Sequence, residues 1–200
     1  CSPHYGERWG RHWLDLAGYA DSEGYTDSDP VRENAFRYRD YVIRSLNQDK
    51  PLDRFILEQL AGDELVGEKG AQLTPDVVEK LTATGFLRMA PDGTGANVNQ
   101  DLARNQVIAD TIQVVSTSLL GMSVHCAQCH DHRYDPISQL DYYRFRAIFE
   151  PALNWKNWKA PPARQVSLYT EENKTTRERI EAEAKIVDQQ RQDRVDFYIA

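Results

Sequence analysis

Apolar residues recur with a helical period near the start of the chain. Between residues 6 and 20, apolar positions are mostly three or four residues apart, with charged residues between them: Trp9, Trp13, Leu16, Ala17 and Ala20. This spacing places the apolar side chains on one face of an amphipathic helix. We therefore predict a helix over residues 6–20 whose tryptophan face packs on the core. His12, at the edge of that face, is expected to point inward.

Similar patterns, bounded by capping residues, predict further helices. The clearest period joins residues that are four, three and four positions apart: Ile108, Ile112, Val115 and Leu119. Thr74, Pro75 and Asp76 have the residue types of a helix start. Ser138 with Asp141 resembles a capping box. The predicted helices cover residues 34–47, 50–60, 74–82, 108–119, 138–149 and 171–200.

Loops rich in Gly, Asp and Pro separate these helices, at residues 21–30 and 91–99. We interpret residues 91–99 as a linker. The predicted fold is all-α, an irregular bundle of about five or six helices around one core, with long loops. Strands are expected to be minor. The charged C-terminal helix has too few apolar positions for a coiled coil and is expected to project from the bundle.

The same patterns predict two regions. Residues 1–160 are expected to form one domain, and residues 161–200 a linker and a charged helix that leads to a further C-terminal domain. The chain begins with Cys1 rather than Met, as expected for a piece of a longer protein. Any signal peptide would then lie upstream of these residues.

Composition excludes some classes of function. Hydrophobic residues make up 40% and charged residues 28% of the 200 residues, which suits a globular chain with one core. No uncharged apolar run approaches the ~20 residues that a membrane-spanning helix needs. The formal net charge of -7 argues against nucleic acid as a partner, because proteins that neutralise phosphates carry an excess of Lys and Arg.

The candidate chemistry is concentrated in the segment HCAQCHDHRYDP, residues 125–136. Cys126, Cys129 and His130 form the C-x-x-C-H pattern of covalent haem attachment. Two thiols three residues apart on a helical turn can each bond a vinyl group of haem, while the next residue directs its imidazole toward the iron. The motif predicts haem c as the cofactor.

Two other interpretations of the motif stay open. A structural zinc site would combine the two thiols with His130 or His132, but tetrahedral zinc normally takes a second ligand pair from a distant segment. The remote candidates lack paired spacing: Cys1, His4 and His12. A redox dithiol would be expected after a strand, whereas a helical pattern precedes this motif. On these alternatives the domain is a zinc-binding or metal-free scaffold that joins its neighbours.

The sixth iron position, where a side chain fills it, usually takes His or Met. Residues beside the motif are too close to reach across the ring, which leaves His12 and Met89. We favour His12, so that His130 and His12 would be the metal ligands. An open iron site would instead favour a haem-dependent oxidoreductase. Arg133, just after the motif, is a candidate to pair with a haem propionate.

Longer segments of the chain resemble a known family. They are GERWGRHWLDLAGYADSEGY, YRDYVIRSLNQDKPLDRFILEQLAGDEL, ATGFLRM and CAQCHDHRYDPISQLDYYRF. In this order they are similar to the planctomycete cytochrome c-type domain family, which is catalogued as a domain of unknown function. The resemblance covers about residues 2–150.

The resemblance implies a domain of large exported bacterial proteins, preceded by a cytochrome c-like domain and followed by another domain of unknown function. Those adjacent domains are the expected partners, while the redox partner is not identified. The family also implies haem attachment and an association with polysaccharide degradation. Because covalent haem is normally attached outside the cytoplasm, we expect a periplasmic or otherwise exported protein. The predicted function is that of a c-type haem-binding electron-transfer domain.

Overall fold

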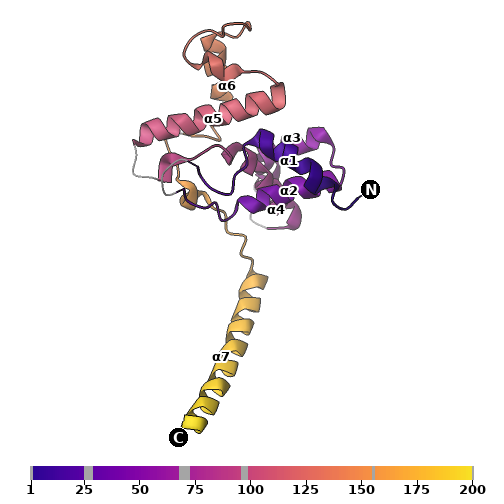
Figure 1. Cartoon of the computed structure of the whole chain (residues 1–200), viewed down its shortest axis with the longest axis vertical. Helices are drawn as coiled ribbons and strands as arrows, with labels where there is room; N and C mark the ends of the chain where they lie inside the picture. The colour runs from indigo at the N-terminus through magenta and orange to yellow at the C-terminus, as the bar shows by residue number, and fades with distance from the viewer. Residues whose placement is uncertain (1, 25–28, 68–72, 96–98, 155, 200) are drawn as a thin grey trace. The chain divides into compact units, whose positions relative to one another are not determined.

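The computed structural model describes residues 2–24, 29–67, 73–95, 99–154 and 156–199. The chain divides into two compact units, Cys1–Gln165 and Val166–Ala200, which are considered separately. Among the described residues, six α-helices belong to the first unit and one to the second (Figure 1): α1 Tyr5–Ala17, α2 Ala35–Asn47, α3 Leu52–Val66, α4 Pro75–Ala83, α5 Gln100–Leu120, α6 Gln139–Ile148 and α7 Glu171–Ile199.

The prediction of an all-α fold is confirmed. In the part of the chain that the structure describes there is no strand, and the only β pairing is an isolated bridge between Ser22 and Val31. Short 3-10 turns link several helices of the first unit. No described helix is both long and apolar enough to cross a membrane.

Two predicted helix starts have the expected capping contacts. The Thr74 hydroxyl accepts a hydrogen bond from the Val77 N–H at 3.3 Å, with Pro75 at the first helical position. At the start of α6, Ser138 and Asp141 form a complete capping box, each side chain accepting from the other residue's N–H. These contacts satisfy N–H groups that have no partner within a helix.

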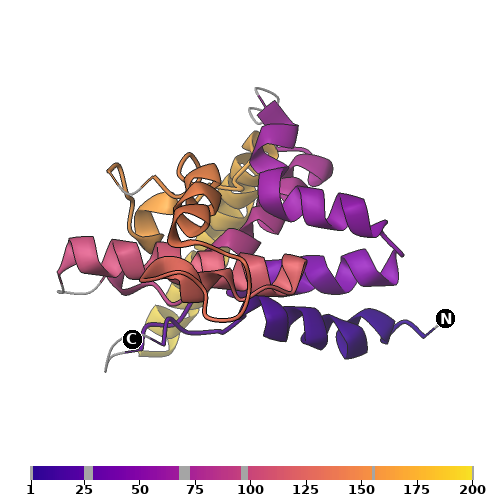
Figure 2. The same ribbon diagram turned by 90° about the horizontal axis from the view of Figure 1, so that it is seen from above.

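Helix α1 packs on α2 through its small residues. Gly6, Gly10 and Ala17 are buried, and Figure 2 shows α1 (indigo) lying along α2 (violet). A Cβ atom on Gly6 would lie 2.2 Å from the Ile43 carbonyl oxygen, so only glycine permits this approach. The predicted helix is therefore correct, but the face it buries is largely the glycine face.

The predicted orientation of the tryptophan face is correct for Trp13 and Ala17 and wrong for Trp9 and Leu16. Trp9 is 48% exposed and Leu16 52% exposed, while Trp13 packs against the core. His12 is also exposed, so the expectation that it points inward is wrong. The physical reason is that glycines bring the two helix backbones closer than tryptophans would allow, and this rotates the larger side chains outward.

The core comprises two hydrophobic clusters instead of the one predicted. The first lies among the first four helices and the segment after them, and includes Tyr38, Tyr41 and Phe55. The second joins α5, α6 and the turn between them. Phe145 of α6 and Phe149, the residue after its end, pack against both clusters and thus connect them.

Several polar side chains beside and within the first cluster have hydrogen-bond partners. The Trp13 Nε1–H lies 3.0 Å from the Tyr38 hydroxyl and 2.9 Å from Oε1 of Gln59. Glu58 accepts hydrogen bonds from the Tyr41 hydroxyl at 2.9 Å and from the Lys50 ammonium at 2.5 Å. Burial, followed by the Glu58 carboxylate, raises the pKa of Tyr41. Pairing therefore offsets the cost of burying these groups.

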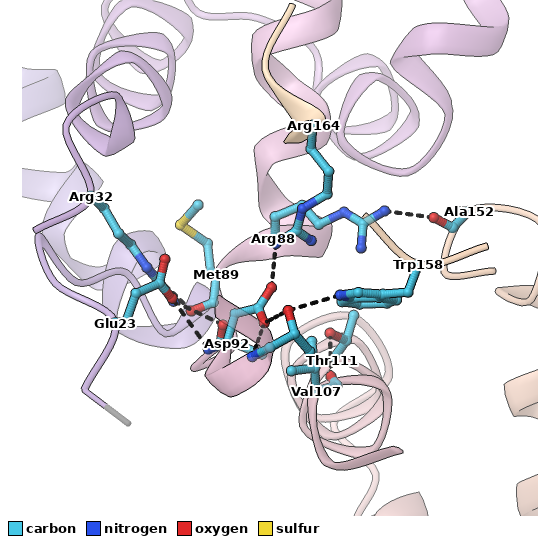
Figure 3. A network of polar contacts seen from close by, with 12 residues as sticks. Glu23, Arg32, Arg88, Met89, Asp92, Val107, Thr111, Ala152, Trp158 and Arg164 are labelled. Atoms are coloured by element: carbon cyan, nitrogen blue, oxygen red, sulfur yellow. Dashed lines mark hydrogen bonds and ion pairs between the residues drawn. The ribbon is translucent and has the colours of Figure 1, made fainter. Parts of the chain in front are cut away.

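The segment predicted as a linker is part of the packed structure. Asp92 and Thr94 are buried, and the Asp92 carboxylate accepts from the Thr94 N–H at 2.9 Å and pairs with Arg164 (Figure 3). The Trp158 Nε1–H donates to the Thr94 hydroxyl at 2.9 Å. These four residues, here called the Asp92 cluster, attach residues 158–164 to the segment before α5. Residues 96–98 of the predicted linker lie outside the described residues.

Two guanidinium groups flank the Asp92 cluster. Arg88 and Arg164 each lie with the guanidinium carbon 5.2 Å from the Trp158 ring centroid. Burial and the Arg164 charge lower the pKa of Arg88 to about 10. Trp158 in turn packs against the second hydrophobic cluster. The cluster therefore stabilises the same core that supports the turn between α5 and α6.

In the second unit, α7 is stabilised by contacts within itself. The Arg177 Nε–H donates to Glu181 at 2.6 Å, and the Gln189 amide donates to Asp193 at 2.8 Å, both four residues along the helix. Its apolar side chains are exposed, including Ile186 and Val187. This agrees with the prediction of a charged helix with few apolar positions.

We expect Gly62→Ala to lower the free energy of unfolding by about 1–3 kcal/mol, because its Cβ would lie 2.1 Å from the Lys80 carbonyl oxygen. Gly10→Ala is the matched control, since its Cβ would meet only ordinary contacts at 3.5 Å and alanine favours helix by up to ~1 kcal/mol. Urea unfolding of both variants measures the difference. Equal stabilities would show that α3 and α4 do not approach this closely.

Asp92→Ala should lower the free energy of unfolding by about 3–5 kcal/mol, because it removes the carboxylate that pairs with Arg164. The control is Arg177→Ala in the exposed pair with Glu181, which should change stability by no more than ~1 kcal/mol. Thermal and urea unfolding report both values. A loss for Asp92→Ala no larger than for the control would mean that the buried pair is not formed.

Candidate functional site

The cysteine motif lies on a short turn directly after α5. Gly121, with φ of 63°, ends α5, and a 3-10 turn follows over Val124–Gln128. Cys126 lies within this turn, and Cys129 is the residue that directly follows its last position. Both are exposed free thiols. Both thiols are therefore accessible to solvent on this short segment.

Two residues of the same turn anchor it to the core. Val124 and Ala127 are 5% and 0% exposed and belong to the second hydrophobic cluster, with Ile108 and Ile112 of α5. The apolar positions are therefore buried, whereas the thiol positions are exposed. This arrangement fixes the direction in which the thiols point, because turning them inward would expose the buried pair.

His130 has one ring nitrogen available. Its Nδ1 lies 2.7 Å from the carbonyl oxygen of Asp131, and the ring is exposed. A carbonyl can only accept, so Nδ1 carries the proton and the Nε2 lone pair is free in the neutral ring. A hydrogen bond of this kind orients many metal-binding histidines. Two adjacent thiols and one available imidazole nitrogen fit the donor set that haem c requires.

His132 differs from His130 in that both of its ring nitrogens have hydrogen-bond partners. Nε2 lies 3.0 Å from the Ser123 hydroxyl, and Nδ1 accepts from the backbone N–H groups of Tyr134 and Asp135 at 3.2 and 2.8 Å. Its side chain is only 7% exposed. His132 therefore holds the loop together and has no nitrogen free for a metal.

The loop is also tied to the start of α6. Oδ1 of Asp131 accepts from the Gln139 N–H at 2.8 Å, and the Gln139 amide donates to the Gln128 carbonyl at 3.1 Å. Within the capping box, hydrogen bonds from Ser138 lower the pKa of the Asp141 carboxyl. These contacts connect the turn that carries the thiols with a rigid helix end.

His125 lies beside the first thiol. Its Nε2 is 3.6 Å from the Cys126 sulfur, and its Nδ1 is buried without a hydrogen-bond partner. Sequence spacing excluded His125 as the sixth iron ligand, because this residue adjoins the motif. Its contact with the thiol depends on the backbone turn, although its position next to Cys126 was a visible signal.

Arg133 lies on the exposed surface of the loop, with its guanidinium carbon 5.4 Å from the Tyr134 ring centroid. Several large apolar side chains around the motif are also exposed: Met122, Tyr134, Leu140 and Tyr143. The Tyr143 hydroxyl lies 3.4 Å from the Gln128 carbonyl, which places α6 next to the thiol turn. The surface of the loop and of the start of α6 thus combines exposed apolar side chains with the Arg133 cation.

The remote candidates from the sequence lie elsewhere in the first unit. His12 on α1 contacts Trp9, with ring centroids 5.5 Å apart, and lines a hollow of about 390 Å³ with Trp13 and Lys50. Met89 is 6% exposed in the first cluster. The contacts described for these two residues do not include the motif.

Two other residues were considered for zinc, His4 and Cys1. His4 bonds Glu7 through Nδ1 at 2.9 Å, and Cys1 lies outside the described residues. Across the part of the chain that the structure describes, no group of three or more His, Cys, Asp or Glu side chains is arranged to hold one metal ion.

A comparison with protein-family models gives a match over residues 1–153. The matching model is PSCyt2, described as a protein of unknown function (DUF1549). Neither the curated proteins nor the solved structures gave a match. The match covers more than three quarters of the chain's 200 residues, including every residue of the motif.

Proposed function

This chain belongs to the PSCyt2 family of proteins of unknown function, and we propose that it binds a covalent c-type haem and transfers single electrons. The proposal rests on the exposure of the two motif thiols and on the hydrogen bond of the motif histidine. Cys126 and Cys129 are exposed on one turn, and the hydrogen bond from His130 Nδ1 to Asp131 leaves Nε2 available. This is the set of groups that covalent haem attachment uses.

Each motif residue has a distinct role in this proposal. Cys126 and Cys129 would form the two thioether bonds, and His130 Nε2 would be the proximal ligand. When bound, the group supplies a one-electron iron couple. Arg133 is proposed to pair with a propionate, because its exposed guanidinium lies on the same loop.

Exposure of the site favours electron transfer. The thiols and His130 face solvent, so a group held there keeps an edge that a partner protein can approach. We do not include His12 as the sixth ligand in this proposal, because its described ring contact is with Trp9. A haem-dependent oxidoreductase is the second form of the proposal, and it requires that no side chain occupy the sixth position.

The biological setting is proposed from the resemblance to the planctomycete cytochrome c-type family. An adjacent cytochrome c-like domain is the proposed source or acceptor of electrons, in an exported protein associated with polysaccharide degradation. The acidic net charge of -7 agrees with a partner that is not a nucleic acid.

A structural zinc site is less well supported than haem. His132, one of its two possible histidine ligands, already uses both ring nitrogens within the loop. The remaining donors, two thiols and His130, would need a fourth ligand from elsewhere. Zinc nevertheless binds thiolates strongly, so metal analysis belongs in the experiment that tests the function.

The test is export of the chain from cells that carry the c-haem maturation system, beside Cys126→Ser/Cys129→Ser. We expect haem to stay with the parent chain on a denaturing gel and to be absent from the double variant, because thioether bonds survive denaturation. Absorbance and metal content are measured on the same preparations. A colourless parent that contains zinc would contradict the haem proposal and favour the scaffold.

His130→Ala and His4→Ala form a matched pair for the ligand assignment. Loss of the His130 imidazole should leave some covalent haem but change the absorbance spectrum, because the iron loses its proximal nitrogen. His4, an exposed histidine bonded to Glu7, should be replaceable without effect. An unchanged spectrum in His130→Ala would refute the assigned ligand.

A further inference from the structure

We propose that His132 is a positioning residue, which holds the thiols and His130 in their receptive arrangement before any cofactor arrives. The inference rests on the proposed function and assigns a role to a histidine that the motif itself does not include. It concerns the loop from Ser123 to Asp135, which encloses all three motif residues. The evidence for it is the set of hydrogen bonds made by the His132 ring.

The tautomer of His132 follows from its neighbours. Nδ1 lies 2.8 Å from the Asp135 N–H and 3.2 Å from the Tyr134 N–H, so it acts as the acceptor. The proton of the neutral ring is then on Nε2, which donates to the Ser123 hydroxyl at 3.0 Å. The Asp135 carboxylate is farther from Nδ1, at 3.4 Å. One ring thus bonds both ends of the loop.

The backbone of His132 adds a third connection. Its N–H donates to the Ile137 carbonyl at 2.8 Å, and Ile137 is buried in the second cluster. The loop is therefore joined to the core at Ile137 as well as at the buried residues of the thiol turn. With a side chain only 7% exposed, His132 is shielded from competing water.

The ring acts on His130 through the residue between them. Asp131 accepts the His130 Nδ1–H with its carbonyl and the Gln139 N–H with its carboxylate. The Gln139 contact restrains the side chain of Asp131, and the contacts of His132 restrain the backbone that follows it. Together they fix the position of the Asp131 carbonyl. His132 therefore sets the orientation of the His130 ring without touching the cofactor.

The physical consequence is preorganisation. A loop that is ordered in advance does not lose further conformational freedom when a ligand binds across its two thiols. Without the ring, Ser123 and residues 134–135 lose their shared partner, and the thiols would sample a wider range of separations. The effect should thus be visible in the cofactor-free protein.

The test uses phenylarsine oxide, a trivalent arsenical that forms two As–S bonds with a pair of nearby thiols and releases its oxygen as water. The haem-free, reduced 200-residue chain is titrated with it. We expect His132→Ala to bind roughly 10-fold or more weakly than the parent, because its thiols are no longer held together. His12→Ala, in an exposed histidine on α1, is the matched control and should bind like the parent.

His132→Asn is the conservative variant. An Asn carbonyl can accept the N–H groups two and three residues ahead, as in an Asx turn, so it should recover most of the lost affinity. Ser123→Ala removes only the partner of Nε2 and gives an intermediate loss. It replaces His132→Ala should that variant fail to fold. Parent-like binding by His132→Ala, or by Ser123→Ala in its place, would overturn the inference.

A second measurement separates this inference from the proposed function. After maturation, the fraction of chains with covalent haem should fall in His132→Ala and be largely restored in His132→Asn, with the absorbance bands of the bound haem unchanged. A colourless parent refutes the function, yet the arsenical titration still decides the role of His132. Equal haem content in the parent and His132→Ala would count against positioning.

Discussion

The turn between α5 and α6 is built around the burial of Val124 and Ala127. These two side chains occupy the second hydrophobic cluster, while Cys126, between them, and Cys129, two residues further on, are exposed. A turn so short cannot reverse its faces without exposing apolar surface, so the thiol direction is set by the core rather than by the thiols. The Asp92 cluster contributes to the same support, because Trp158 packs on that core.

The two histidines His130 and His132 have different hydrogen-bonding roles because their neighbours differ. His130 faces a carbonyl, which requires a proton on Nδ1, whereas His132 faces two backbone N–H groups, which require a lone pair there. The same side chain thereby has a nitrogen without a hydrogen bond in one position and connects parts of the loop in the other. The role of each histidine depends on which backbone group faces its Nδ1, and the loop conformation determines that group.

Helix packing at the N-terminal end illustrates how small residues determine orientation. Gly6 and Gly10 of α1 permit close contact with α2, and Trp9 and Leu16 remain exposed while Trp13 packs on the core. The sequence of this segment contains two sets of side chains at helical spacing, one of glycines and one of tryptophans. Hydrophobicity alone favoured the tryptophans, whereas the close backbone approach favoured the glycines.

By itself the sequence determined the all-α fold, the approximate positions of the helices and the cysteine motif, because helical period, caps and local spacing act over a few residues. Ser138 and Asp141, for example, cap α6 through neighbours within one turn. Only the tertiary structure decided that His12 is exposed, that Asp92 is buried and that His132 connects the loop. Each of these depends on a partner brought close by folding, and no local pattern specifies such a partner.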